Sequence, residues 1–424
     1  MPRRTALKRT LTLLSARRVG RWTALVAVGL LVLALSACNP EENTYRTRTP
    51  RPVGTRGPFP TLETVPWRKA GAVITGDNGG KIELLGTLVS HTLTVFRLEF
   101  SPDSSTMISI DGGGTAVVWD LDTGTTKFNV GVRDAIYAFF NADASQIVTV
   151  NADEKLYFIN AVNGTILSSV PANSGGVRAA AISADRTLLA TGGFKGDVSV
   201  WNIQTRSLVR RNTIGRDIGI LAVAFSPDGK TVAATTSDKS LYVWDAQSGA
   251  QLQAVTDLPN FAPHLLYAND GTFLVVATID TVYIYDMVPF RLRQTLTSPN
   301  QFTDGGLALS PDSKLLAVAT KGDNANVWSV ATGQIAVSVL QQQQAATSFA
   351  FAPNGSFLLN TIFNENSGSF IWLVSSFTDD DPNVSGKNFN VLSNGIGLGA
   401  WTPDSKRIIL ADGSGGLFVY GLPE

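Results

Sequence analysis

A short turn motif returns eight times along the 424-residue chain, and it constrains the fold more than any other feature. The clearest copy is Phe225–Gly229, whose sequence is FSPDG. Each copy is led by an apolar residue: Phe100, Phe140, Ile182, Phe225, Tyr267, Leu309, Phe351 and Trp401. Successive copies lie 40 to 50 residues apart, a period typical of units built from four short strands.

One repeat shows the expected order of its strands. Ile220–Phe225 is a continuous run of mostly small apolar residues, as expected of a strand buried on both sides. The turn leads to Thr231–Thr236, then to Leu241–Asp245, and last to the more polar Gln251–Val255. Burial therefore falls along the repeat, as in sheets that radiate from an axis. The repeats predict an all-β fold, a single eight-bladed β-propeller, with a seven-bladed ring as the alternative.

The last repeat lacks a fourth strand of its own. Its third strand is Leu417–Tyr420, and only four residues follow in this sequence. A strand-like segment, Lys81–Leu88, precedes the first full repeat. We predict that residues 81–89 complete the last blade, because this pairing would remove an open sheet edge.

A Trp-containing pair follows four of the turns, each with Trp 19 residues after the leading residue: Trp119-Asp120, Trp201-Asn202, Trp244-Asp245 and Trp328-Ser329. In these marks residues 81–424 resemble the WD-repeat family, which implies a non-enzymatic scaffold for protein binding. We expect the Trp side chains to be core wedges. Of the family's polar staple, His91 is in place, but Gly113 and Lys195 replace its aspartate. The staple is therefore predicted to be mostly missing.

The N-terminal segment reads as a targeting signal. Residues 1–69 hold 13 Lys and Arg but 3 Asp and Glu, and an uncharged run, Trp22–Ala37, precedes Cys38, the only cysteine. Leu35-Ser36-Ala37-Cys38 resembles the lipobox of bacterial lipoproteins; a plain signal anchor with an incidental cysteine is the alternative. We expect a signal peptide at 1–37, a lipidated Cys38 with a Pro- and Thr-rich tether at 38–66, and the propeller at 67–424. The resemblance implies anchoring in a bacterial cell membrane, on its extracytoplasmic face.

The charges and reactive residues argue against most chemistry. Because 21 of 34 basic and 31 of 34 acidic residues fall in 70–424, the propeller is acidic and no nucleic-acid partner is expected. Two isolated histidines argue against a catalytic triad, and no cofactor, metal ligand set or catalytic residue is predicted. Asp379–Asp381 could suggest Ca²⁺ but reads better as a solvated loop.

The predicted interaction surface is the rim around the axis, where loops enter the innermost strands. Phe96, Asp134, Arg178 and Phe261 fall near this opening. Aromatic and charged groups together suit a binding hot spot for a protein or peptide; the alternative is that they cap the channel. The protein is expected to act as a monomer.

Two other functions stay open from the sequence. Leu121–Gly124 and Ala331–Gln334 resemble the quinoprotein-like repeats of certain lipoproteins. Those lipoproteins assist the assembly of envelope or outer-membrane proteins, which is the first alternative function. A propeller hydrolase such as a lactonase is the other alternative, since fold alone does not decide function.

Overall fold

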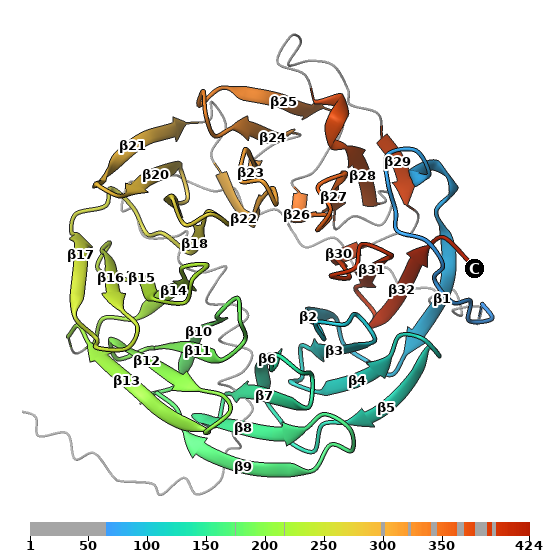
Figure 1. The fold of residues 1–424 in the computed structure, drawn as a ribbon, viewed down its shortest axis with the longest axis horizontal. Coiled ribbons are helices and arrows are strands. Elements are labelled where there is room, and N and C mark those ends of the chain that lie inside the picture. Colours follow the sequence, from blue (N-terminus) through green and yellow to red (C-terminus); the bar gives the residue numbers. More distant parts are fainter. Residues whose placement is uncertain are drawn as a thin grey trace, which may run out of the picture. The chain divides into compact units, whose positions relative to one another are not determined.

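Eight sheets of four antiparallel strands stand around a central axis in the computed structural model (Figure 1). The structure describes residues 65–424 apart from residues 174 and 216 and the segments 298–301, 321–323, 341–345, 363–368, 378–387 and 392–395. The predicted eight-bladed propeller is confirmed, and the seven-bladed alternative is wrong.

Blades 1 to 4 run from the innermost to the outermost strand in chain order. Their strands are β2 (Val95–Phe100), β3 (Thr106–Asp111), β4 (Ala116–Asp120), β5 (Thr125–Asn129), β6 (Ala135–Phe140), β7 (Gln146–Asn151), β8 (Lys155–Asn160), β9 (Ile166–Pro171), β10 (Val177–Ile182), β11 (Leu188–Gly193), β12 (Asp197–Asn202), β13 (Ser207–Thr213), β14 (Ile220–Phe225), β15 (Thr231–Thr236), β16 (Leu241–Asp245) and β17 (Gln251–Val255).

Blades 5 to 7 repeat this order, and blade 8 combines three C-terminal strands with the first strand of the chain. These strands are β18 (His264–Tyr267), β19 (Phe273–Ala277), β20 (Thr281–Met287), β21 (Phe290–Thr297), β22 (Phe302–Leu309), β23 (Leu315–Thr320), β24 (Asn324–Ser329), β25 (Ile335–Leu340), β26 (Ala346–Phe351), β27 (Phe357–Ile362), β28 (Ser369–Leu373), β29 (Asn388–Val391), β30 (Ile396–Trp401), β31 (Arg407–Asp412), β32 (Gly416–Gly421) and β1 (Glu83–Val89).

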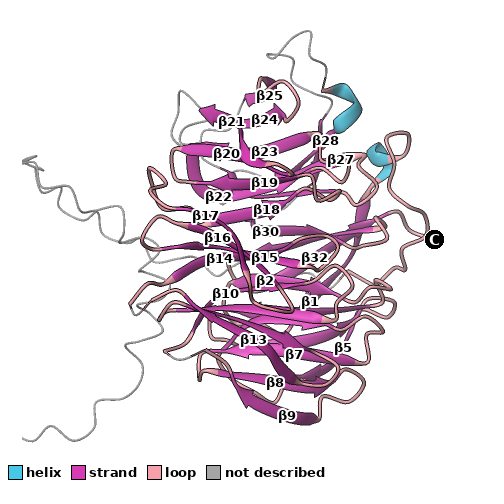
Figure 2. Cartoon of the chain, turned by 60° about the vertical axis from the view of Figure 1, so that its left-hand side comes forward, coloured by secondary structure: helices cyan, strands magenta, loops and turns pink. Residues whose placement is uncertain are grey.

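The only helices among the described residues are two single turns of 3₁₀ helix, η1 (Gly79–Lys81) and η2 (Val374–Ser376). No helix in this part of the chain is long and apolar enough to cross a bilayer. The strands run between two opposite faces of the ring, and the loops gather at those faces (Figure 2).

The repeated turn joins the two innermost strands of each blade. In blade 4 the Asp228 carboxylate accepts hydrogen bonds from Ser226 Oγ (2.7 Å) and Lys230 N (3.1 Å), while Thr231 N donates to Ser226 Oγ (3.0 Å). Gly229 adopts a φ of +68°, which glycine accommodates without a steric penalty. Side-chain hydrogen bonds thus stabilise this turn locally.

The ring closes as predicted, through pairing of strands from opposite ends of the fold. β1 pairs antiparallel with β32, from Glu83 opposite Gly421 to Val89 opposite Gly416, with a register shift between Leu84 and Gly86. The preceding segment adds an antiparallel bridge between Ala70 and Pro423. The strand begins two residues later than predicted, because Gly79–Lys81 forms the turn η1.

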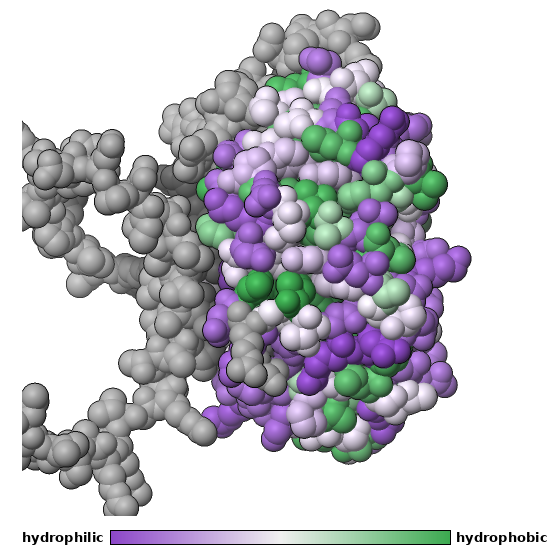
Figure 3. Space-filling view, turned by 90° about the vertical axis from the view of Figure 1, so that its left-hand side faces the viewer, coloured by the Kyte–Doolittle hydropathy of each residue, from purple (hydrophilic) through white to green (hydrophobic). Residues whose placement is uncertain are grey.

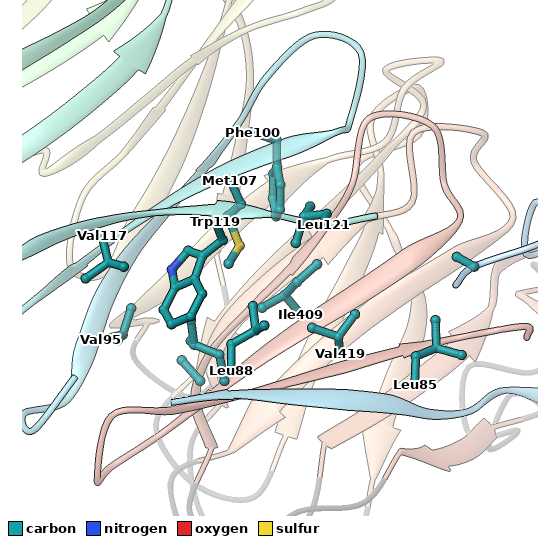
Figure 4. Packing of buried hydrophobic residues seen from close by; sticks show 13 residues of the cluster. Leu85, Leu88, Val95, Phe100, Met107, Val117, Trp119, Leu121, Ile409 and Val419 are labelled. Atoms are coloured by element: carbon teal, nitrogen blue, oxygen red, sulfur yellow. The ribbon is translucent and has the colours of Figure 1, made fainter. Parts of the chain in front are cut away.

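Apolar side chains fill the spaces between neighbouring blades. Between blades 8 and 1, Leu88 of β1 and Val419 of β32 pack in one cluster with Met107 and Trp119 of blade 1 (Figure 4). Trp119 is 2% exposed, and Trp201, Trp244 and Trp328 are equally buried. The Trp side chains are core wedges, as the sequence predicted, and their burial favours folding by excluding large apolar surfaces from water.

Candidate functional site

One face of the ring carries both the loops that enter the innermost strands and the loops between the second and third strands. These loops are tied together within each blade: Gly112 N donates to Thr94 O (3.0 Å), and Ser237 N donates to Gly219 O (2.8 Å). We call this face the entry face. Its inner edge is the mouth of the central channel.

The four predicted rim residues all stand at the entry face, but they do not form one group. Phe96 and Arg178 are the second residues of β2 and β10, and Asp134 directly precedes β6. These three belong to blades 1, 3 and 2. Phe261 precedes β18 in blade 5, and β18 stands across the ring from β2 (Figure 1). Phe261 therefore lies across the channel from Phe96 and two blades away from Arg178.

A network that the sequence did not indicate links the mouth across blades 1 to 3. The guanidinium carbon of Arg97 lies 4.1 Å from the centroid of the Tyr137 ring, at cation–π distance. Tyr137 Oη donates to Arg178 O at 2.9 Å. The Arg178 guanidinium in turn lies 6.0 Å from the centroid of Phe194. Burial lowers the pKa of Arg178 and the Tyr137 hydroxyl opposes that shift, but an arginine stays charged at neutral pH.

Large apolar side chains are exposed on the same face. Leu93, Phe96, Phe194, Phe261 and Ile279 are each at least 37% exposed. Lys239 Nζ lies 5.6 Å from the ring centroid of Phe261, so this aromatic also has a cationic neighbour. Exposed aromatics beside cations form a surface suited to protein binding.

The prediction about the polar staple is wrong for blade 1. His91 Nδ1 lies 3.0 Å from Asp111 Oδ2 and His91 Nε2 lies 2.7 Å from Ser109 Oγ, while Trp119 Nε1 donates to Ser109 Oγ at 2.8 Å. The aspartate is Asp111, at the end of β3. It lies two residues before Gly113, the position at which the sequence comparison expected it.

Blade 3 contains a variant of the same staple. Trp201 Nε1 donates to Thr191 Oγ1 at 3.0 Å, and Thr191 Oγ1 donates to Asn173 Oδ1 at 2.6 Å. Asn173 thus replaces the histidine. The Asn173 amide nitrogen also donates to Asp197 O at 2.9 Å, which connects the segment before β10 to the first residue of β12.

Asp111, His91 and Ser109 are linked by hydrogen bonds in the same order as the residues of a hydrolase triad. Their burial shows that they stabilise the blade instead. The side chains of His91 and Asp111 are 0% and 4% exposed, and Ser109 is fully buried. Ser109 Oγ also accepts the indole hydrogen bond of Trp119, so a substrate has no path to this hydroxyl. Within the described ranges, no group of three or more His, Cys, Asp or Glu side chains could hold a metal ion.

Two hollows lie away from the entry face, among the turns of the opposite face. A groove of about 400 Å³ between blades 4 and 5 is lined by Pro227, Leu252, Tyr267 and Val288. Burial raises the pKa of Tyr267 to about 12, which leaves this phenol protonated at neutral pH. A second hollow of about 260 Å³, at the junction of blades 8 and 1, contains Asp122 and Arg407, whose side chains pair at 2.9 Å.

Several predictions fall on parts of the chain for which the structure makes no statement. The signal peptide, Cys38 and the tether up to residue 64 lie outside the described residues. So do Asp379–Asp381 and the rest of the acidic insertion.

The chain matches known repeat proteins in both sequence and fold. The family model described as "WD domain, G-beta repeat" matches residues 82–120, 164–202 and 211–245. Among solved structures, the computationally designed Ika8 protein superposes with a TM-score of 0.65 at 19% identity, over 79% of this chain and 98% of the designed one. That similarity shows the fold alone.

Relatives in sequence are eukaryotic proteins. Periodic tryptophan protein 2 homolog of Dictyostelium discoideum is 25% identical over 58% of this chain and 26% of its own length. Pre-mRNA-processing factor 19 of Oryza sativa subsp. japonica is 23% identical over 58% of this chain and 49% of its own, and WD repeat-containing protein VIP3 of Arabidopsis thaliana is 26% identical over 39% and 56%. The chain thus spans from about a quarter to just over half of the length of these relatives. In its matched repeats and in these relatives, the chain is similar to WD-repeat proteins.

Proposed function

We propose that this protein is a non-enzymatic scaffold that binds a protein or peptide on the entry face of its propeller. The observation that carries the proposal is the exposure of Phe96 and Phe194 beside the arginines of the channel mouth. The buried staple of blade 1, with its inaccessible Ser109, favours binding over hydrolysis. WD-repeat relatives are consistent with a protein partner.

The test is cross-linking of the full-length protein in its own membranes, followed by pull-down and mass spectrometry. Phe96→Ala should lose the captured partner, and Phe261→Ala should show whether the far side of the mouth contributes. Leu252→Ala is the matched control, since Leu252 is as exposed but lies on the outermost strand β17. Capture that survives Phe96→Ala and Phe261→Ala but is lost in Leu252→Ala would move the binding surface to the outer edge.

We further propose that Cys38 carries the lipid that anchors the protein, as a monomer, to the outer side of a bacterial cell membrane. Support comes from the sequence: a basic segment, an uncharged run and a single cysteine after two small residues. Cys38→Ala should abolish labelling by radioactive palmitate. Ser36→Ala, which keeps a small residue, should be labelled like the wild type; equal labelling of Cys38→Ala would contradict the proposal.

A further inference from the structure

Two arginines at the channel mouth form no ion pair with a carboxylate of the described residues. Arg97 and Arg178 project from the innermost strands β2 and β10. Neither guanidinium forms a hydrogen bond or ion pair with any residue in the described part of the chain, and Arg97 Nε is buried without a partner. A buried donor without an acceptor is costly, so this group is better satisfied when an outside acceptor is bound.

Both guanidinium groups are nevertheless held in place. Arg97 stacks on Tyr137, and Arg178 lies beside Phe194. Arg178 Nη1 also lies close to the backbone of blade 4, 3.9 Å from the position that a Cβ on Gly219 would occupy. Tyr137 connects the two sites through its hydrogen bond to Arg178 O. Side chains that are positioned before binding lose less conformational entropy when a ligand arrives.

The nearest acids do not neutralise this pair. Glu99, two residues beyond Arg97 in β2, is close enough for the Arg97 charge to help lower its pKa, but its carboxylate pairs with Arg186 Nη1 at 2.8 Å towards the other end of the channel. Asp134 stands at the entry face, but its carboxylate forms no ion pair within the described ranges. The mouth of blades 1 to 3 is therefore locally cationic, although residues 70–424 hold 31 of the 34 acidic residues and 21 of the 34 basic ones.

Apolar side chains flank the arginines. Phe96 directly precedes Arg97, and Leu93 and Phe194 are also exposed on this face. Apolar contacts around a charged pair exclude water, which strengthens hydrogen bonds between a guanidinium and a carboxylate. The outer side of the ring differs: across β17 and β21, hydrophobic residues stand in small groups among hydrophilic ones (Figure 3).

We propose that Arg97 and Arg178 bind carboxylates of an acidic segment in the partner protein, whose apolar residues pack on Leu93, Phe96 and Phe194. The inference rests on the proposed function and narrows its partner to a peptide that combines acidic and apolar residues. A nucleic-acid strand is disfavoured because it carries a charge at every nucleotide, so that the phosphates beyond the arginines would be repelled by the overall acidic propeller. Two carboxylates of a peptide can bind to Arg97 and Arg178 without contacting the acidic surface elsewhere on the propeller.

The test uses fluorescence polarisation with full-length protein in detergent and synthetic ten-residue peptides. One peptide contains the sequence Glu-Leu-Glu-Phe, and its twin contains Gln-Leu-Gln-Phe. The Glu peptide should bind at least roughly tenfold more tightly than its twin, since hydrogen bonds to charged groups are the stronger ones. Arg97→Gln and Arg178→Gln should each reduce the affinity for the Glu peptide roughly tenfold and leave that for the twin unchanged.

Arg210→Gln is the matched control. Arg210 is exposed on the outermost strand β13, where its Nε donates a 3.4 Å hydrogen bond to Gln247 O. This variant should bind both peptides like the wild type, and thermal unfolding should show that all variants fold. Equal binding of the twins, no binding of the Glu peptide, an equal loss in Arg210→Gln, or tighter binding of a single-stranded oligonucleotide would each overturn the inference.

Cross-linking in membranes separates this inference from the broader proposal. If Phe96→Ala loses the captured partner while Arg97→Gln and Arg178→Gln retain it, the scaffold stands and carboxylate binding is wrong. If these three variants and Phe261→Ala all retain the partner, the entry face is not the binding surface, and both proposals fail. Loss in all three, with retention in Arg210→Gln, supports both.

Discussion

At the scale of single residues, one ion pair connects three blades at the end of the channel away from the entry face. Arg186, in the turn between β10 and β11 of blade 3, donates to Phe140 O of blade 2 (3.1 Å) and to Glu99 of blade 1 (2.8 Å). Burial raises the pKa of Glu99, and Arg186 opposes that shift. Both side chains are 21% exposed, so the pair is largely removed from water. Breaking such a pair strands a charge, which costs more than the loss of a surface contact.

Arg186→Met should therefore lower the free energy of unfolding by about 2–3 kcal/mol at pH 8. The remaining Glu99 carboxyl would have a folded-state pKa above its unfolded value of about 4.3. Its protonation then favours the folded state, so the deficit should shrink as the pH falls from 8 towards 5. Urea denaturation at several pH values measures this. Lys314→Met, which breaks a pair that is 79% and 57% exposed, should change stability by less than about 0.5 kcal/mol; a similar loss in both variants would contradict the argument.

At the scale of the element, the turn between the two innermost strands is used eight times with one backbone conformation. The fifth residue of the motif has positive φ in every copy: Ser104, Ala144, Arg186, Gly229, Gly271, Ser313, Gly355 and Ser405. Five copies therefore hold a side chain in the left-handed region, where a Cβ is unfavourable. The strain is tolerated because Ser and Asp side chains fasten the turn.

Ala144→Gly should stabilise the protein by about 0.5–1 kcal/mol, because the relief of left-handed strain exceeds the added flexibility of the unfolded chain. The reverse change, Gly229→Ala, should cost about 1 kcal/mol. A Cβ at Gly229 would meet only Ser183 Cβ, at 3.9 Å, so crowding does not explain that cost. Differential scanning calorimetry of both variants decides; opposite signs are expected, and equal signs would refute the conformational account.

The lowered pKa values of the aspartates in these turns let us predict how the stability of the protein changes with pH. Hydrogen bonds from Ser145 to Asp143 and from Ser226 and Lys230 to Asp228 lower the pKa of both carboxyls. A lowered folded-state pKa means that the stabilisation is present above the unfolded value of about 3.9 and is lost as the pH falls through the folded value. The midpoint of thermal unfolding should drop between about pH 4 and pH 2. Asp228→Asn should be less stable than wild type at pH 6, and this gap should narrow at pH 2.

The sequence predicts the strands and blades of this protein, but it does not predict most contacts between blades. The period of the turn and the unpaired Lys81–Leu88 segment were enough to predict the number of blades and the closing strand, because both depend on neighbouring residues and on pairing. The network of Arg97, Tyr137 and Arg178 could not be predicted, since it depends on how close three blades approach. Asp111 escaped detection because it reaches the staple from a strand end rather than from the expected turn position.

At the scale of the whole molecule, closure depends on contacts between the first and last blades. β1 supplies the outermost strand of blade 8, and Leu85 and Leu88 on it are buried in the cluster shared with blade 1. Arg407 of blade 8 pairs with Asp122 of blade 1, and Asp404 N donates to Ser104 Oγ at 3.0 Å. Hydrogen bonds, an ion pair and apolar packing thus reinforce one seam.

Deletion of residues 81–89 should open this seam, exposing the edge of β32 and the apolar cluster behind it. We expect a lower unfolding temperature and a larger hydrodynamic radius or aggregation in size-exclusion chromatography, since an unpaired strand edge promotes association. A synthetic peptide of residues 81–89, added in trans, should restore both values, whereas a scrambled peptide should not. Unchanged unfolding temperature after the deletion would show that closure does not need this strand.

The pairing of β1 with β32 also bears on the order in which the blades fold. β1 stands near the start of the described part of the chain, and its partner β32 follows about 330 residues later. Until then the polypeptide is an arc with two free edges, and joining them carries the entropic cost of a long-range contact. Blades 1 to 7 can form one after another from local contacts, whereas blade 8 forms last. Until its ends join, such an arc exposes apolar surface, so we expect the time needed for closure to set how long the chain is open to proteolysis and aggregation.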